Sequence, residues 1–303
     1  MSFAEAEKEK RKPKEEKLPI VWVYDDCNYI GLLNASIGIA EKIRPDGKYE
    51  IHSKEDFNNV NNMIYTGTLP DITVGTGYCH NAHYVSPFPD ELLFPANCIS
   101  SEKIEAGRKE WQNQFSGFPE PRIAILLGGE CASFRPDSDM MRMLAQECAK
   151  KAKDLGGSLI ITTSKRTGQE AKEAFINEIN KSGVPNYLYD WSINNGKNNP
   201  YFGILGSADA IIATGESRSM CSDANKSKKP VYIYDFNSEV SEYDMEFHQQ
   251  LYDRNVAKPF SEFLEKGIVP WDYEPLDTAG DIAKEALKRW REMQESVRTH
   301  KLG

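Results

Sequence analysis

The chain has 303 residues, of which 40% are hydrophobic and 27% charged, and it carries a net charge of −9 at pH 7. This composition is typical of a soluble globular protein, and the acidic balance argues against general nucleic-acid binding, which needs a basic surface. The six cysteines include no CxxC pair, and no apolar run approaches the ~20 residues of a membrane helix. We therefore expect a cytoplasmic protein without an integral membrane segment.

The start of the chain, residues 1–17, is polar and mixed in charge, which predicts a disordered tail. A basic run at residues 10–14 could be a targeting or anionic-surface patch. A solvated tail is the favoured interpretation because acidic residues interrupt the basic ones.

An N-terminal α/β domain is expected over residues 18–118. Its predicted strands and helices lie at 19–24, 33–43, 71–74, 91–94 and 100–114. The loop after the first strand carries Asp25 and Asp26, either of which could act as a general base beside a cleft. The simpler interpretation is that both residues cap the following helix.

A group of possible metal ligands follows the second of these strands, namely Cys79, His80 and His83. Two histidines three residues apart can share one face of a helix. No fourth ligand has a recognisable spacing, so we predict no metal site. His83 stays a candidate acid/base or hydroxyl-binding residue.

The pattern becomes clearer beyond a linker expected at residues 117–121. Strands and helices alternate about five times, which predicts a parallel, doubly wound sheet. The predicted strands lie at 122–127, 158–163, 187–189, 210–214 and 231–234. A last helix at 278–297 has one apolar stripe, which packing on a domain surface would explain.

Three loops follow the carboxyl ends of these strands and should meet at one edge of the sheet. The candidate nucleotide- or diphosphate-binding residues near them are Gly128, Gly129, Ser164, Lys165, Arg166, Thr214, Gly215, Glu216, Ser217, Ser219 and Asp223. Backbone N–H groups, hydroxyls and two cations are what a pyrophosphate needs. The alternative is that Ser217 and Ser219 only cap the next helix, and that Asp223 is a solvated surface residue.

Several phrases of the sequence occur together: IAILLGG at 123–129, GGSLIITTSKRTG at 156–168, and the long stretch NPYFGILGSADAIIATGESRSMCSDANKSKKPVYIYDF at 199–236. In combination they resemble the mitochondrial-fission "elongated mitochondria" protein family of plants and bacteria. The resemblance implies two Rossmann-like domains facing a cleft, as in glycosyltransferase-B enzymes, with the N-terminal domain reduced. The C-terminal domain would hold a nucleotide-sugar and the N-terminal domain an acceptor.

The implied domains are an acceptor side at 18–118, a nucleotide-sugar side at 119–275, and a helix at 276–303 that packs back across the domains. Trp290 or Met293 would then contact residues before Gly117. The resemblance also gives Asp223 the role of binding ribose hydroxyls, although the family usually has Glu there and has Asp where this chain has Glu216.

The leading functional hypothesis is a metal-independent, cofactor-free glycosyltransferase-like protein that binds a nucleotide-sugar and transfers the sugar to an acceptor hydroxyl. One alternative is a non-catalytic scaffold of the same family that binds a protein partner. Another is a nucleotide-binding regulator without transfer chemistry.

Overall fold

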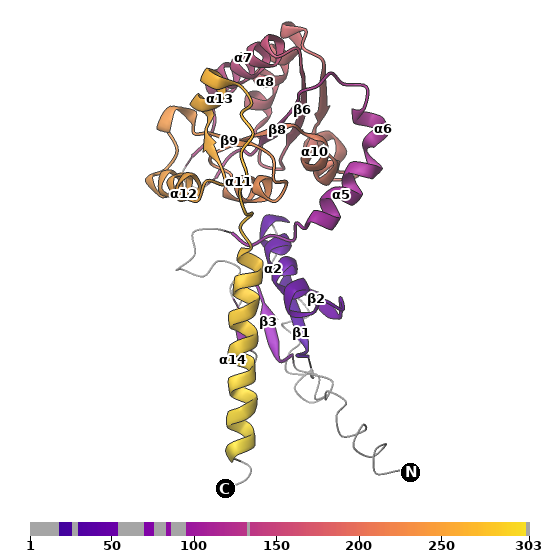
Figure 1. The fold of residues 1–303 in the computed structure, drawn as a ribbon, viewed down its shortest axis with the longest axis vertical. Helices are drawn as coiled ribbons and strands as arrows, with labels where there is room; N and C mark the ends of the chain where they lie inside the picture. Colours follow the sequence, from indigo (N-terminus) through magenta and orange to yellow (C-terminus); the bar gives the residue numbers. More distant parts are fainter. Residues whose placement is uncertain are drawn as a thin grey trace. The chain divides into compact units, whose positions relative to one another are not determined.

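The computed structural model describes residues 18–25, 30–53, 70–75, 83–85, 95–131 and 134–300. The chain divides into two compact units (Figure 1). Unit 1 comprises Met1–Pro87 with Ala279–Gly303, and unit 2 comprises Phe88–Thr278. The tail at 1–17, the strand predicted at 91–94, and Asp26, Cys79 and His80 lie outside the described residues.

Unit 1 is built on a parallel sheet with strand order β2-β1-β3-β4. Its elements are the strands β1 (Val21–Asp25), β2 (Tyr49–Ser53), β3 (Ile72–Val74) and β4 (His83–Val85), and the helices α2 (Ile30–Ile43) and α14 (Thr278–His300). α2 packs on β1 and β3, where Val23 and Ile72 are fully buried. From Ala279 on, α14 belongs to this unit, and its residue Trp290 is buried.

One prediction in unit 1 was wrong. We considered a helix face shared by His80 and His83, but His83 begins the strand β4. The short apolar pair Tyr84-Val85 lies in this strand, in parallel register with Thr73 and Val74 of β3. Pairing with a neighbouring strand therefore decides the structure here, and the local sequence spacing does not.

Unit 2 contains a six-stranded sheet with order β10-β9-β8-β5-β6-β7, in which every neighbouring pair is parallel. The strands are β5 (Arg122–Leu127), β6 (Ser158–Thr163), β7 (Asn186–Tyr189), β8 (Ala210–Thr214), β9 (Val231–Tyr234) and β10 (Lys258–Pro259). The predicted parallel, doubly wound sheet is confirmed. Its strands read as nearly continuous apolar runs because helices cover both faces.

Helices cover both faces of this sheet (Figure 1), and a hydrophobic core lies on each face. One core contains α7 (Ser138–Asp154), α8 (Gln169–Ser182) and α13 (Phe260–Lys266). The other contains α5 (Ser101–Glu110), α6 (Gln112–Phe115), α10 (Tyr201–Ser207), α11 (Arg218–Asn225) and α12 (Glu242–Asp253). Alternate residues of β5 serve the two cores: Ile123 and Ile125 lie in the first, and Ala124 and Leu126 in the second.

The helices α5 and α10 pack closely because glycines lie at their contact. A Cβ atom on Gly107 would lie 2.5 Å from the Cβ of Phe202, and one on Gly203 would lie 2.6 Å from the Cγ of Trp111. This contact holds α5 within unit 2. The division between the units therefore comes earlier in the chain than the linker we expected at 117–121.

Replacing Gly203 by alanine is expected to lower the free energy of unfolding by about 1–3 kcal/mol, because the new methyl group overlaps the Trp111 side chain. Urea denaturation of the variant measures this change. Gly117→Ala is the matched control, because a Cβ there meets no atom within 4 Å. The control should change stability by no more than about 0.5 kcal/mol. Equal stability of the two variants would contradict the close contact.

Candidate functional site

The candidate site lies where β5 and β8 run side by side in the centre of the unit 2 sheet, with Leu126 in register with Ala213. The helix that follows β5, α7, packs on one face of the sheet, and the helix that follows β8, α11, packs on the other. The two connections therefore diverge at the carboxyl ends of these strands. Open α/β sheets bind their ligands in the crevice at such a point.

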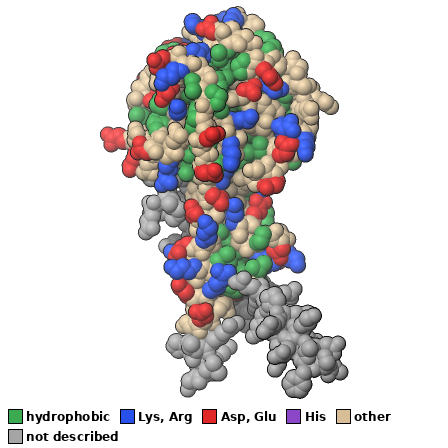
Figure 2. All heavy atoms as spheres, in the orientation of Figure 1, with side chains coloured by type: hydrophobic (Ala, Val, Ile, Leu, Met, Phe, Trp, Pro, Cys, Tyr) green, Lys and Arg blue, Asp and Glu red, His purple; other side chains and the backbone are tan. Residues whose placement is uncertain are grey.

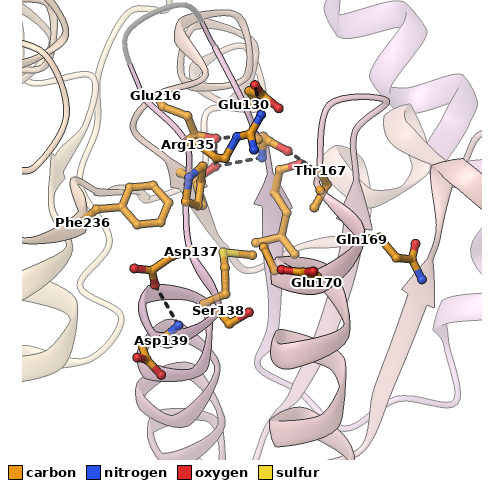
Figure 3. Close-up of a pocket in the computed structure, with 18 of the residues that line it drawn as sticks. Glu130, Arg135, Asp137, Ser138, Asp139, Thr167, Gln169, Glu170, Glu216 and Phe236 are labelled. Atoms are coloured by element: carbon orange, nitrogen blue, oxygen red, sulfur yellow. Dashed lines mark hydrogen bonds and ion pairs between the residues drawn. The ribbon is translucent and has the colours of Figure 1, made fainter.

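A pocket of about 540 Å³ opens at this position, within unit 2 (Figure 3). Pockets of this size accommodate small molecules and cofactors. The residues that line it are Leu127, Gly128, Gly129, Glu130, Arg135, Pro136, Asp137, Ser138, Asp139, Met141, Arg142, Thr167, Gly168, Gln169, Glu170, Ala171, Thr214, Glu216 and Phe236. They come from the loops after β5, β6 and β8, the first turns of α7 and α8, and the segment that follows β9.

Two glycines connect the loop after β5 to the loop after β8. The N–H of Gly128 donates to the Thr214 Oγ1 at 2.8 Å, and the N–H of Gly129 donates to the Glu216 Oε1 at 2.5 Å. A Cβ on Gly128 would lie 2.1 Å from that same carboxylate oxygen, and one on Gly129 would lie 2.2 Å from the carbonyl oxygen of Arg166. Only residues without a side chain fit at this close approach of three loops.

The loop after β6 completes the arrangement. The Ser164 hydroxyl donates to the Gly128 carbonyl at 2.7 Å, and Thr167 also bonds to that carbonyl. Arg166 Nη1 donates to the Glu130 carbonyl at 2.9 Å. The three loops therefore meet, as we expected from their positions after strands. The N–H groups of Gly128 and Gly129 are engaged within the protein, however, whereas we expected the loops to offer such groups to an anion.

Other backbone N–H groups lie at the pocket, on the first turns of two helices. The first turn of α7 is capped by Asp137, whose carboxylate accepts from the N–H groups of Asp139 and Met140 at 2.8 and 2.9 Å. The first turn of α8 follows Gly168, which has no side chain to cap it. The N–H groups at the start of α8 therefore remain available to an anionic ligand in the pocket.

Charged side chains of both signs lie around the pocket. Figure 3 shows Arg135 at the same end of the pocket as Glu130 and Glu216, and Arg135 forms an ion pair with Glu130. Arg142 pairs with Asp139 on the first turns of α7. Mixed charges also cover the visible face of unit 2, which shows no continuous basic surface (Figure 2). The pocket can thus offer cations to phosphate groups and carboxylates to hydroxyl groups.

Glu216 is the most deeply buried of these charged groups, with only 4% of its surface exposed. Its Oε1 accepts hydrogen bonds from the Gly129 N–H and, at 3.0 Å, from the Thr214 hydroxyl. Its Oε2 is buried and has no hydrogen-bond partner among the described residues. Burial raises the pKa of this carboxyl group to about 7. The hydrogen bonds from its own backbone N–H, from Thr214 and from Gly129, and the charge of Arg166, act in the opposite direction.

The remaining candidates near the loop after β8 lie away from the pocket lining. Ser217 occupies the position before α11, but its hydroxyl makes no capping hydrogen bond, so the expected cap is not formed. Asp223 lies on α11 and accepts a hydrogen bond from the Tyr201 hydroxyl at 3.1 Å. Burial raises the pKa of Asp223 to about 7. Ser217, Ser219 and Asp223 are not among the pocket residues.

The other predicted residues are distributed as follows. Lys165 is exposed on the loop after β6. Asp25 ends β1 and His83 begins β4, both in unit 1. The side chains of these two residues, and the whole of Asp26, lie outside the described part of the structure. Asp25, Asp26 and His83 therefore stay predictions as catalytic residues.

A family model described as "Mitochondrial fission ELM1" matches residues 92–290 of the chain. The chain belongs to the mitochondrial fission ELM1 family. The resemblance predicted from the sequence is thereby confirmed.

An uncharacterized protein of Rickettsia prowazekii is 32% identical over 192 residues, covering 61% of this chain and 52% of the relative. The mitochondrial fission protein ELM1 of Arabidopsis thaliana is 28% identical over 196 residues, covering 64% of this chain and 43% of the relative. The matches therefore span about half the length of these curated relatives.

Two solved structures have a similar backbone arrangement. A family 9 glycosyl transferase from Veillonella parvula has a TM-score of 0.46 at 10% identity, with 93% of this chain and 100% of that chain covered. A UDP-GlcNAc 2-epimerase from Neisseria meningitidis, bound to UDP-GlcNAc, has a TM-score of 0.44 at 8% identity, with 90% and 99% covered. At this distance nothing about the ligand of this ELM1 family member follows from them.

Sequence reasoning missed several residues of the site in this ELM1 family member. His248 of α12 is buried, and its Nε2 lies 2.8 Å from the Gly215 carbonyl oxygen, which holds the turn after β8. Arg135, Asp137 and Phe236 reach the pocket from loops whose sequence shows no motif. The apolar stripe at 141–152 indicates a helix, and a residue with a capping side chain is expected directly before a helix. That pattern could have identified Asp137 as the capping residue.

Two searches of the described residues found no further site. No three His, Cys, Asp or Glu side chains within 18–25, 30–53, 70–75, 83–85, 95–131 and 134–300 form a group that could hold a metal ion. In the same part of the chain, no helix combines the length and apolar character that crossing a membrane requires.

Proposed function

We propose that this ELM1 family member binds a nucleotide-sugar in the pocket at the carboxyl ends of β5 and β8. The observation that carries the proposal is the position of the pocket, at the point where the connections after two central parallel strands diverge. Nucleotides bind at this point in open α/β sheets because loop N–H groups and a helix N-terminus converge there.

The residues of the pocket suit the parts of such a ligand. The uncapped first turn of α8 and Arg135 supply N–H and guanidinium donors for a diphosphate. Arg166 lies next to the lining, where its guanidinium donates to the carbonyl of Glu130. Carboxylates of the pocket lining can accept hydrogen bonds from sugar or ribose hydroxyls. The ring of Phe236 points into the pocket in Figure 3 and offers an apolar surface to a base or a sugar ring.

The chemistry that fits this ligand is transfer of the sugar to an acceptor hydroxyl. A base takes the proton of that hydroxyl, its oxygen bonds to the sugar C1, and the bond from C1 to the diphosphate oxygen breaks. The diphosphate leaves with the bonding electron pair, and the donors at α8 and Arg166 stabilise its charge. Asp25, Asp26 and His83 are the proposed candidates for the base. A carboxylate of the pocket lining takes the ribose role that the resemblance gave to Asp223, because Asp223 is not among the pocket residues.

A binding screen tests the proposal. UDP-glucose, GDP-mannose, ADP-glucose and CMP-sialic acid are added separately, and thermal unfolding is followed. A ligand present at about 100 times its Kd stabilises the folded protein by about 2.7 kcal/mol. We expect one of the four to raise the unfolding temperature. Absence of any shift with all four would contradict the proposal, and the scaffold hypothesis, which the open pocket does not favour, would take its place.

Arg166→Ala is expected to weaken nucleotide-sugar binding by about ten- to hundredfold, because one charge-assisted hydrogen bond to the diphosphate, worth about 1.5–3 kcal/mol, is lost. Isothermal titration calorimetry with the tightest of the four ligands measures this change. The control is Arg289→Ala on α14, where the arginine pairs with Glu285 in unit 1. Unchanged affinity in both Arg166→Ala and Lys165→Ala would contradict a diphosphate role for the loop after β6.

A further inference from the structure

One oxygen of Glu216 is an acceptor without a partner. The side chain is 96% buried, and its Oε2 makes no hydrogen bond within the described residues, although the residue lines the pocket. Buried polar atoms in folded proteins are nearly always hydrogen-bonded, and an unsatisfied one carries the full cost of its desolvation. An unpaired acceptor on a residue that lines a pocket is a candidate contact for the ligand group that completes the site.

We propose that the Glu216 Oε2 accepts a hydrogen bond from a hydroxyl group of the bound nucleotide-sugar and makes the pocket selective for ligands that carry this hydroxyl. The inference rests on the proposed function and deepens it. It gives Glu216 a different role from the diphosphate contacts with which the sequence grouped it.

The side chain is fixed for this task. The Gly129 N–H and the Thr214 hydroxyl both hold Oε1, at 2.5 and 3.0 Å, so the carboxyl group cannot rotate freely. Its backbone is held as well, because His248 contacts the carbonyl oxygen of the preceding residue, Gly215, at 2.8 Å. A preorganised acceptor loses little entropy when the ligand binds.

The chemistry of the group selects a hydroxyl over a phosphate. An ionised carboxylate only accepts hydrogen bonds, so it pairs with a hydroxyl, whereas a phosphate oxygen at the same place would require Glu216 to keep its proton and donate it. A hydroxyl therefore releases the proton on binding, and a phosphate would not. A pocket built to pair with a hydroxyl discriminates strongly against an analogue without it, because the buried acceptor is then left unpaired. The phosphate groups belong instead near the first turn of α8.

Protonation of Glu216 provides a readout that is independent of activity. The charged or titratable groups around it are Arg166 from the loop after β6, Cys221 from α11, His248 from α12, and Glu130 and Arg135 at the same end of the pocket. Burial raises the pKa of Glu216 to about 7, so a sizeable fraction is protonated at neutral pH. A donor hydroxyl stabilises the ionised form, and binding should therefore release protons.

The experiment is calorimetric titration at neutral pH with the tightest of UDP-glucose, GDP-mannose, ADP-glucose and CMP-sialic acid, in HEPES and in Tris. The dependence of the binding enthalpy on the buffer gives the number of protons released. We expect a measurable fraction of a proton to be released per ligand bound to the wild type. We expect no release for Glu216→Gln, with affinity about ten- to hundredfold lower. Glu173→Gln, on the exposed face of α8, removes the same charge and should behave as the wild type.

Analogues of that nucleotide-sugar that each lack one hydroxyl identify the group and need no folded variant. We expect one analogue to bind the wild type about tenfold or more weakly than the parent nucleotide-sugar does, and to bind without proton release. With Glu216→Gln, that analogue and the parent nucleotide-sugar should differ little in affinity, because the acceptor is already lost. Three results together would overturn this inference and leave the proposed function standing. They are binding to the wild type without proton release, unchanged affinity in Glu216→Gln, and wild-type binding of every deoxy analogue as tight as that of the parent nucleotide-sugar. Absence of binding by all four nucleotide-sugars would overturn the proposed function and this inference together.

Discussion

Lys172→Met is expected to lower the free energy of unfolding by about 3–5 kcal/mol, because it leaves a buried carboxylate without its counter-charge. Lys172 on α8 and Asp190 after β7 are about 5% exposed, and their charged atoms lie 2.7 Å apart. Lys172 also donates to the Ser192 hydroxyl at 2.6 Å. Burial alone would raise the pKa of Asp190, but the hydrogen bonds from Lys172 and Ser192 hold it below its usual value.

The same helix offers a matched control for this change. Lys181 pairs with Glu178 at 2.6 Å, but the lysine side chain is 70% exposed, so Lys181→Met should cost less than about 1 kcal/mol. Adding Asp190→Asn to Lys172→Met removes the unpaired charge and should restore part of the stability. Urea denaturation measures all three variants. Equal costs for Lys172→Met and Lys181→Met would contradict the buried pair, which fixes the helix whose first turn lines the pocket.

The stability of the wild type relative to Glu216→Gln is expected to fall by about 3 kcal/mol as the pH rises from about 4.5 to about 7. Below pH 4.5 the Glu216 carboxyl is protonated in the folded and unfolded states, so it makes no difference to their balance. Between the ordinary pKa of 4.5 and the folded pKa of about 7, only the unfolded state loses its proton, which favours unfolding. Above this window both states are ionised and the difference stays constant.

Urea denaturation of the two proteins across this range measures the effect, because the difference between them removes the contribution of the other titrating groups. A difference in stability that stays flat between about pH 4.5 and 7 would contradict the buried, unpaired carboxyl group. Such a result would also remove the basis for proton release on ligand binding.

The sheet of unit 2 could be predicted because its strands are buried on both faces. Ile123–Leu127 and Ala210–Thr214 are continuous apolar runs bounded by glycine or polar residues, and short buried parallel strands have this pattern. The strand β2 was missed because Tyr49–Ser53 alternates polar residues with few apolar ones. The helices α12 and α13 were missed because aromatic and charged residues obscure their periodicity.

The candidate site could be predicted only in part. Loops that follow parallel strands must meet at one edge of the sheet, and this placed Gly128, Gly129, Thr214 and Glu216 together. The side on which a helix leaves that edge depends on how it packs. α11 crosses to the opposite face from α7 and α8, which carries Asp223 towards Tyr201 and away from the pocket. Local spacing contains no information about that choice.

The central claim is that the pocket between the loops after β5 and β8 is a nucleotide-sugar site. A crystal structure of the protein with the tightest-binding of the four nucleotide-sugars tests it most directly. We expect the phosphate group or groups of the ligand at the first turn of α8, near Arg166, and a ligand hydroxyl within hydrogen-bond distance of the Glu216 Oε2. A nucleotide-sugar bound elsewhere on the chain, with the pocket beside Gly128 and Gly129 empty, would contradict the claim.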